Sequence, residues 1–572
     1  MSAMVGAFLF VVLLAITSAA ATALAPVLLG SMTLDPASTA ALRASVAGSA
    51  PDAEPMTLGQ EFHGFATTLG YDHQRLTENA HLLYEINMGA SVTRGGVFFG
   101  SWGVQRSSPG RDHRSTDKYD GRLYGLDPLT GAALRGWPLA LDPTPRCYAW
   151  PDRPRTPTDV LLCGIGNPWH ASFYNGTVEG QPAVDPARGV LYVGRGDGKL
   201  YAVDLAAGRV LWRYTTFDPQ KPGDPDGGGE VIAAPLLDAA RQAVYFGSWG
   251  EGPYETNAFY AVGADGRLRW RWPARASLDH RFFAAPALSP DGATVYAAGW
   301  VDDGLRAPAS VYAFRADPAG AAEDAERLAW TLELTHRGRP VWAATLAVGH
   351  DGTVYVGGLL NDARGNVPVL AAIEPPAAPG AGPRLRWAAP YAELRDGAHL
   401  VQGIALRETG GRTVRIYATT ASVGGPLGNG NPAGRLYAID PATGRVLAAY
   451  RPAGDVRGAV GGLNSPAIGA DGVVYVGVRG SYRLGFTPAR NGHVFAVRFD
   501  ERRGRWERLW SRELEGHVEW SHPAIGPDGA LYLASSAGSG TSGSTYFGVH
   551  APGTVPAGST PRFYAFRGPP AP

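Results

Sequence analysis

Eight residues that could form a binding site share one place in a repeating sequence pattern, just before a short apolar segment. They combine carboxylates, imidazoles, an amide and indoles, which are the groups that orient ligands in protein sites. The alternative is that they hydrogen-bond neighbouring loops, because polar groups around an interior channel need partners. The candidates are Glu179, Glu230, His280, Trp342, Gln402, Asn464, Trp520 and His522.

Three of these candidates carry oxygen atoms that suit a calcium ion. Glu179, Glu230 and Asn464 offer carboxylate and amide oxygens, the ligands that hard cations take. The segment 224–230 also contains acidic residues, but it lacks the alternating spacing of a calcium loop, and a plain turn explains it. The sequence therefore assigns no metal site with a defined ligand set.

A second group of candidates is aromatic. Phe99-Gly100-Ser101-Trp102-Gly103 and Phe246-Gly247-Ser248-Trp249-Gly250 repeat one pattern, and Trp300 ends a similar segment. Trp102, Trp249 and Trp300 are expected at strand ends on one face, where they could form a platform for a sugar, a quinone or a protein partner. Packing between repeats is the alternative.

The composition indicates what kind of elements position these residues. Of 572 residues, 77 are Gly and 46 are Pro, while 45% are hydrophobic. The hydrophobic content excludes a disordered chain, and the Gly and Pro content disfavours a helical one. Many short strands joined by tight turns fit both facts. The formal net charge is zero, so there is no electrostatic reason to expect nucleic acid as a partner.

An internal repeat organises the chain. Its clearest copy lies within 181–214 and predicts four strands, at 182–184, 190–194, 199–204 and 209–213, with turn residues between them. The unit recurs in eight copies over residues 90–568. Four antiparallel strands in each of eight repeats predict an all-β fold, an eight-bladed β-propeller.

The two ends of the repeat array suggest how the ring closes. The last copy ends with Arg562–Phe566, its third strand, and no fourth strand follows. The segment His81–Ile86 resembles a fourth strand without a blade of its own. We expect this N-terminal strand to complete the last blade, which would leave no open edge.

The lengths of the connections distinguish two faces of the predicted ring. The turns between first and second strands, and between third and fourth strands, are short and form the short-turn face. The other connections form the long-loop face, where binding usually occurs on a rigid scaffold. The long connections are 103–120, 142–178, 215–230, 421–433, 479–492 and 535–561.

The N-terminus predicts export. No charged side chain precedes Asp35, and residues 4–16 are strongly apolar. Ala23-Leu24-Ala25 fits a signal-peptide cleavage site, but Pro26 disfavours cleavage, so a single membrane anchor is the alternative. The predicted organisation is a signal peptide or apolar anchor helix at 1–30, a linker at 31–75, the propeller at 76–568 and a tail at 569–572. The expected location is periplasmic or secreted.

Cys147 and Cys163 are the only cysteines, and both lie in the long connection 142–178. In an oxidising compartment the two could pair and hold that loop. Two unpaired thiols are the alternative.

The motif Ala202-x-Asp204-x-x-x-Gly208-x-x-x-Trp212 resembles the repeat of the pyrroloquinoline quinone (PQQ) enzyme-like propellers, the quinoprotein alcohol dehydrogenase-like superfamily. Residues 125–131 and 438–444 match in part, and Ala448 stands where the Trp would be. The resemblance implies that the Trp packs between blades. It covers nearly everything after residue 80. Members of the superfamily include quinoprotein dehydrogenases and outer-membrane assembly lipoproteins.

The resemblance leaves two functions to weigh. A quinoprotein dehydrogenase of alcohols or sugars would use calcium-bound PQQ, a catalytic Asp, a Trp floor and often a disulfide between adjacent cysteines. Here no cysteines are adjacent, no motif places a catalytic Asp, and no haem motif is present. We therefore expect a non-catalytic extracytoplasmic propeller, a binding or scaffold module in a cell-envelope or membrane protein assembly. Its partner would be a protein on the long-loop face, with no cofactor assigned.

Overall fold

The computed structural model describes most of the repeat region. All described residues belong to one compact unit, Arg75–Pro572. None of the helices formed by these residues is long and apolar enough to cross a membrane. The described residues are 89–101, 121–142, 178, 180–216, 229, 231–249, 257–277, 280–299, 307–316, 327–362, 365–378, 380–391, 400–421, 434–457, 462–480, 491–518, 521–535 and 562–567.

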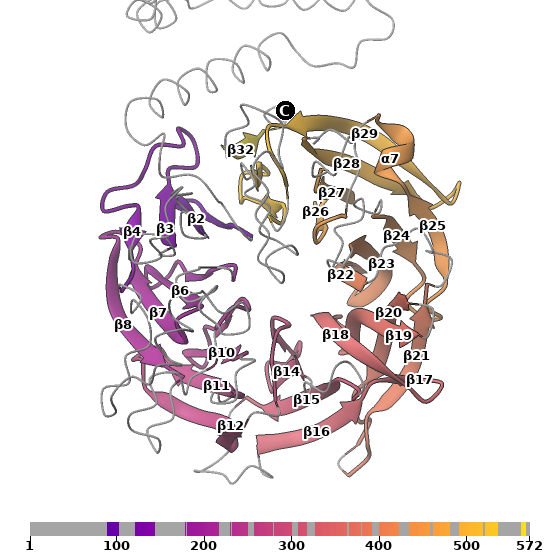
Figure 1. Cartoon of the computed structure of the whole chain (residues 1–572), viewed down its shortest axis with the longest axis horizontal. Coiled ribbons are helices and arrows are strands. Elements are labelled where there is room, and N and C mark those ends of the chain that lie inside the picture. The colour runs from indigo at the N-terminus through magenta and orange to yellow at the C-terminus, as the bar shows by residue number, and fades with distance from the viewer. Residues whose placement is uncertain are drawn as a thin grey trace, which may run out of the picture. The chain divides into compact units, whose positions relative to one another are not determined.

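Eight antiparallel sheets, the blades, are arranged in a ring (Figure 1). The first four blades follow the chain from its described start. Blade 1 contains β1 (Ser91–Thr93), β2 (Gly96–Gly100), β3 (Arg122–Leu126) and β4 (Leu139–Ala140); blade 2 contains β5 (Ala183–Asp185), β6 (Val190–Arg195), β7 (Lys199–Asp204) and β8 (Arg209–Thr215). Blade 3 contains β9 (Leu236–Asp238), β10 (Ala243–Gly247), β11 (Asn257–Gly263) and β12 (Leu268–Ser277); blade 4 contains β13 (Ala287–Leu288), β14 (Thr294–Gly299), β15 (Ser310–Arg315) and β16 (Leu328–Glu333).

The other four blades continue the same order. Blade 5 contains β17 (Thr335–His336), β18 (Arg339–Val348), β19 (Val354–Asp362), β20 (Gly365–Glu374) and β21 (Arg384–Pro390); blade 6 contains β22 (Leu400–Thr409), β23 (Arg412–Ala421), β24 (Leu436–Ile439) and β25 (Val446–Tyr450), followed by the one-turn helix α7 (Pro452–Asp455). Blade 7 contains β26 (Ala467–Ile468), β27 (Val473–Val478), β28 (Gly492–Asp500) and β29 (Arg505–Leu514); blade 8 contains β30 (Ala524–Ile525), β31 (Leu531–Ser535) and β32 (Arg562–Phe566).

The burial of each strand follows from its place in the blade. The middle strands, such as β10 and β11, are buried along their whole length because neighbouring blades cover both faces of the sheet. The outer strand β8 alternates between exposed and half-buried residues, because only one of its faces is covered. The eight-bladed all-β fold expected from the repeat is confirmed.

A tyrosine on the second strand and a tryptophan on the fourth strand pack together within most blades. The ring centroids of Tyr192 and Trp212 in blade 2 are 5.8 Å apart. The indole of Trp212 also donates a hydrogen bond of 2.9 Å to the carbonyl of Ala264 in blade 3. A Cβ on Gly266 would lie 2.8 Å from that indole, so the turn of the next blade needs glycine there. The tryptophan therefore packs between blades, as the resemblance implied.

Blade 6 lacks this tryptophan and receives one from blade 7. Ala448 occupies the expected position on β25. Trp506, at the start of β29, packs against Tyr417 of blade 6 with ring centroids 5.4 Å apart, and its indole donates to the carbonyl of Ala448 at 3.4 Å. The neighbouring blade thus fills the position that the alanine leaves open.

The first and last blades meet directly. Phe99 of β2 stacks on Phe563 of β32 with ring centroids 4.5 Å apart, and the hydroxyl of Tyr532 donates to the carbonyl of Pro128 at 3.3 Å. The described part of blade 8 has three strands, as expected. The proposed closing strand, residues 81–86, lies outside the described residues, as does the apolar helix expected within 1–30, which is therefore not borne out. These two elements and the domain boundaries stay predictions.

Candidate functional site

A buried hydroxyl forms the base of four connections on the long-loop face. In blade 3 the hydroxyl of Ser248, just after β10, accepts the N–H of Ala258 at 3.0 Å, and the Ser248 N–H donates to the Ala258 carbonyl at 3.0 Å. Ser101, Thr420 and Ser535 make the same side-chain bond in blades 1, 6 and 8. A buried serine or threonine thus satisfies a backbone N–H where the chain leaves each of these four sheets, and the repeated Gly-Ser-Trp pattern supplies it in blades 1 and 3.

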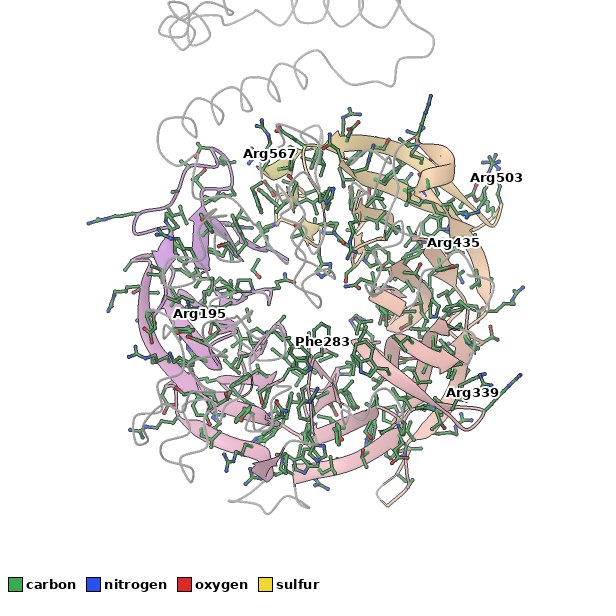
Figure 2. The ribbon with its side chains drawn as sticks, in the orientation of Figure 1. Arg195, Phe283, Arg339, Arg435, Arg503 and Arg567 are labelled. Carbon is green, nitrogen blue, oxygen red and sulfur yellow. The ribbon has the colours of Figure 1, made fainter. Side chains whose placement is uncertain are left out.

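Three half-buried aromatic residues from successive blades cover the core of blades 4 and 5. Trp249 follows β10, Phe283 precedes β13, and Trp342 lies on β18; all three pack against the same buried cluster. The rings of Trp249 and Phe283 meet edge to face, with centroids 6.1 Å apart. Figure 2 shows Phe283 near the centre of the ring. We call these three residues the axial aromatic cluster.

The position of two candidates differs from the expectation. Trp342 and Gln402 were expected just before the first strands of their blades, but they lie inside β18 and β22. The strands start earlier because Val341 pairs with Leu360 and Val401 pairs with Thr420, which continues each ladder beyond the repeat pattern. The backbone carbonyl of Gln402 accepts a bond from the Ser465 hydroxyl at 3.5 Å, which links blades 6 and 7.

His280 is held between blades 3 and 4. Its ring packs on Trp272 with centroids 4.8 Å apart, and its Nδ1 atom lies 3.3 Å from the hydroxyl of Tyr312. Burial raises the pKa of Tyr312, so this hydroxyl stays protonated at neutral pH and can donate to the imidazole. The structure therefore gives His280 a packing and hydrogen-bonding position between blades.

Asn464 and His522 are brought together where blades 7 and 8 meet. The buried amide of Asn464 donates to the carbonyls of Val518, at 3.1 Å, and Ser521, at 2.7 Å. The Nδ1 atom of His522 accepts the N–H of Ser465 at 3.0 Å. Burial lowers the pKa of His522 to about 4, so the ring is neutral at pH 7 and Nδ1 can accept this bond.

A buried charge cluster joins blades 1 and 2 where the connection 142–178 begins. The guanidinium of Arg195 is 0% exposed and donates to the Asp197 carboxylate at 2.9 Å and to the Asp142 carbonyl at 2.5 Å. The same Asp197 oxygen accepts from Tyr201 at 2.6 Å and lies 3.3 Å from the Lys199 ammonium. Burial and the Asp197 charge raise the pKa of Tyr201, which keeps this phenol a donor.

Several candidates cannot be placed. Among the residues that the structure describes, no three His, Cys, Asp or Glu side chains gather in a way that could hold a metal ion. The amide nitrogen of Asn464 donates to two carbonyls, which leaves its Oδ1 atom as the only atom that this side chain could offer to a calcium ion. The candidates outside the described residues are Glu179, Glu230, Trp520, Trp102, Trp300, Cys147 and Cys163. Their roles stay predictions.

Sequence reasoning missed Phe283 and the buried Arg195. The segment 280–284 approaches the first strand of blade 4, where Phe282 is buried between blades and the next residue turns to the axis. Because side chains alternate along an extended chain, that alternation was the available signal for Phe283. No such signal marks Arg195, because its partner Asp142 lies in another blade.

Comparisons with known proteins match this chain to other β-propellers with a similar repeat. The family model described as outer membrane protein assembly factor BamB matches residues 120–300, which is less than half of the chain. Among solved structures, the quinohemoprotein alcohol dehydrogenase of Comamonas testosteroni is 15% identical with a TM-score of 0.48, covering 80% of this chain and 71% of that one. BamB of Moraxella catarrhalis is 16% identical with a TM-score of 0.38, covering 64% of this chain and 82% of that one.

A short segment of the chain is also similar to part of an enzyme. Aspartate ammonia-lyase of Pseudomonas aeruginosa is 57% identical over 47 residues, which is 8% of this chain and 10% of that enzyme. The chain thus matches about a tenth of the length of this relative, and the match carries no activity over. The family match over residues 120–300 and the eight-bladed repeat geometry together confirm the resemblance to the PQQ-like repeat β-propellers that the motif indicated.

Proposed function

We propose that this protein is a non-catalytic binding or scaffold propeller outside the cytoplasm, in an assembly of the cell envelope. The observation that carries the proposal is the axial aromatic cluster of Trp249, Phe283 and Trp342, half-buried and supported by a packed core. Aromatic residues on a rigid base are the usual anchors of protein interfaces. The match to the family of an outer membrane assembly factor supports the same kind of role.

The polar candidates support a scaffold in a different way. His280, Asn464 and His522 each hold a neighbouring blade, with the polar contacts described above. Groups used in this way stiffen the ring and leave binding to the apolar surface and the long connections. The proposed partner is therefore a protein that inserts an apolar or aromatic side chain at the long-loop face.

The proposed location rests on the N-terminal sequence. The uncharged apolar stretch before Asp35 supports export, with or without retention as a membrane anchor. Cell fractionation followed by N-terminal sequencing tests this part. We expect the protein in the envelope or secreted fraction, and a cytosolic protein with Met1 intact would contradict it.

The second candidate function is a PQQ-dependent, calcium-assisted dehydrogenase of alcohols or sugars. The axial aromatic cluster favours it too, because aromatic faces can stack on a planar quinone. When bound, PQQ would accept the two electrons of substrate oxidation. Its calcium ligands would have to come from Glu179 and Glu230 together with Asn464, and both glutamates lie outside the described residues.

The test of the scaffold function is recovery of a partner through the axial aromatic cluster. Affinity-tagged protein is cross-linked in native membranes, solubilised and purified, and the recovered proteins are quantified for the wild type and for Phe283→Ala and Trp342→Ala. The matched control is Leu211→Ala, an apolar residue 41% exposed on the outer strand β8. Thermal unfolding shows whether each variant is folded.

We expect one partner to be recovered in constant ratio with the wild type and the control. Both cluster variants should lose most of it while remaining folded, because truncating an anchor in a packed interface costs about 2 kcal/mol or more. Equal recovery with all four proteins would contradict the proposed use of this surface.

A further inference from the structure

A pocket lies on the short-turn face, opposite to the long connections. It has a volume of about 670 Å³ and is formed where blades 8, 1 and 2 meet. Its apolar wall comes from the turns and strands of these blades, with one charged residue, Arg94, in the turn between β1 and β2. The main apolar residues of this wall are Val92, Phe98, Pro186, Leu205 and Pro527.

The wall of this pocket is held firmly from behind. Phe98 is 2% exposed and packs on the indole of Trp137, with ring centroids 5.3 Å apart. The same indole donates to the carbonyl of Leu205 at 3.3 Å, which ties blade 1 to blade 2 beneath the pocket. Two of the lining residues are prolines with a fixed backbone angle. A preformed wall loses little conformational freedom when a ligand binds.

The positive charge of Arg94 is not balanced by a carboxylate among the described residues. Arg94 is exposed and forms no ion pair with another described residue, whereas nearby carboxylates on the same face are paired. Asp185 lies 3.8 Å from the guanidinium of Arg188, and Asp528 lies 3.9 Å from that of Arg567. The pocket thus combines an apolar wall with one uncompensated positive charge at its edge.

We propose that this pocket binds a small monocarboxylate with an apolar body, such as a medium-chain fatty acid. The carboxylate would pair with the guanidinium of Arg94, which presents two parallel N–H groups to such an anion. The apolar body would lie against Phe98, Leu205 and the prolines. The volume falls within the range of roughly 300–1,000 Å³ that is usual for small-molecule sites.

A free small molecule fits this pocket better than a peptide. Peptides bound in extended form rely on main-chain hydrogen bonds. Here the turn amides are already satisfied internally: Gly95 N–H donates to the Thr93 hydroxyl at 3.1 Å, and Ala206 N–H donates to the Asp204 carboxylate at 2.9 Å. Side-chain burial and the single charge therefore supply the recognition.

Calorimetric titration of the full chain tests the proposal with three probes of equal chain length, namely decanoate, decanol and decylammonium. The two ions are used below their micelle concentrations and decanol below its solubility limit. The variants are Arg94→Gln, which removes the charge, and Ala206→Trp, which fills the pocket from an exposed turn position. The control is Arg267→Gln, an arginine on the same face in blade 3 that lies outside the pocket.

We expect saturable binding of one decanoate per chain and much weaker binding of the alcohol and the amine. Arg94→Gln should weaken decanoate binding by about tenfold or more, because a charge-assisted hydrogen bond is lost. Ala206→Trp should abolish binding, and Arg267→Gln should leave it unchanged.

Two results would overturn the proposal. One is equal binding of decanoate and decylammonium, or undiminished binding by Arg94→Gln, because recognition would then not depend on the carboxylate. The other is clearly tighter binding of the tripeptide acid acetyl-Leu-Leu-Leu than of decanoate, because the site would then serve a peptide C-terminus.

Discussion

Arg195 is fully enclosed between blades 1 and 2, and its charge must be compensated locally. The compensation comes from Asp197, two residues along the chain, which also accepts from Tyr201. Burying a charge pair does not by itself stabilise a fold, but removing one partner leaves the other charge uncompensated in a place without water. The cluster therefore makes the start of the connection 142–178 sensitive to single substitutions.

We predict that Asp197→Ala lowers the free energy of unfolding by about 3 to 5 kcal/mol, because the buried guanidinium of Arg195 loses its ion pair with Asp197. Tyr201→Phe removes one donor to the same carboxylate and should cost about 1 to 3 kcal/mol. Chemical denaturation of both variants measures these losses. The control is Asp265→Ala, which breaks the exposed pair with Arg267 and should cost less than about 1 kcal/mol. Equal losses of unfolding free energy for Asp197→Ala and the control would show that the buried ion pair matters no more for stability than the exposed one.

His522 makes the stability depend on pH. Its pKa is lowered to about 4 in the folded protein, whereas an unfolded histidine has a pKa of about 6.5. Between these values the unfolded state binds more protons, so stability rises with pH and is lost as the pH falls from about 6.5 towards 4. Protonation of Nδ1 would also remove the acceptor for the Ser465 N–H.

We predict that the wild type loses up to about 3 kcal/mol from this group between pH 7.5 and pH 4. His522→Asn keeps an acceptor near the Nδ1 position but does not titrate, so it should lose less over the same range. Denaturation curves at both pH values, compared between the two proteins, cancel the contribution of the carboxylates that both contain. An identical loss in both proteins would contradict the assignment.

At the level of the strands, a tyrosine on the second strand and a tryptophan on the fourth strand pack together within most blades. The indole N–H of Trp212 or Trp387 then donates to a carbonyl of the next blade. The arrangement is nearly constant, with ring centroids 5.6 Å apart for Tyr296 and Trp330 and 6.3 Å apart for Tyr355 and Trp387. The exception in blade 6 keeps the contact but takes the indole from blade 7. The repeat thus keeps the contact between an indole and the tyrosine of the second strand, even in blade 6, where the tryptophan comes from another position in the sequence.

We predict that Trp506→Ala lowers the free energy of unfolding by about 3 kcal/mol, because the cavity next to Tyr417 cannot close. Ala448→Trp alone should also destabilise, by about 1 to 3 kcal/mol, because Trp506 already occupies that space. The double variant should lose less unfolding free energy than the two single losses added together, by about 1 kcal/mol or more, since the new indole fills the place of the old one. If the two losses of unfolding free energy simply add in denaturation experiments, then the Trp506 indole does not occupy the place of a tryptophan at position 448.

The sequence predicted the blades well because each is a local unit of alternating apolar residues and turn signals. It also indicated, through Ala448, that one blade departs from the pattern. It could not indicate Trp506 as the replacement, since that contact joins residues 58 positions apart in different blades. The partners of Asn464 and His522 escaped prediction for the same reason.

At the level of the whole molecule, stability depends on closing the ring between blades 8 and 1. The described contact is apolar and extensive, with Phe563 stacked on Phe99 and Tyr532 bonded to Pro128. β32 is the outermost described strand of blade 8, and the predicted strand at 81–86 would pair with its edge. An exposed edge of this kind promotes association between molecules.

We predict that deleting residues 1–88 lowers the melting temperature and makes the protein aggregate, because the last blade loses its closing strand. Deleting residues 1–75 should leave both properties unchanged, since that variant keeps the strand. Differential scanning fluorimetry and light scattering compare the two truncations with the full chain. A monomeric 1–88 deletion with an unchanged melting temperature would show that closure does not involve this segment.

The two faces of the ring have different predicted roles. The long-loop face carries the axial aromatic cluster and the connections proposed to bind a protein, and the short-turn face carries the pocket next to Arg94. Both roles treat the ring as a rigid support for binding. The central claim is therefore that this propeller binds but does not catalyse.

Titration of the purified full chain with PQQ and calcium, followed by absorbance and by reduction of an artificial dye with alcohols and sugars, tests that claim most directly. We predict no stoichiometric binding and no substrate-dependent dye reduction. Stoichiometric binding together with dye reduction that Glu179→Gln or Glu230→Gln abolishes would contradict the scaffold function and establish a quinoprotein dehydrogenase.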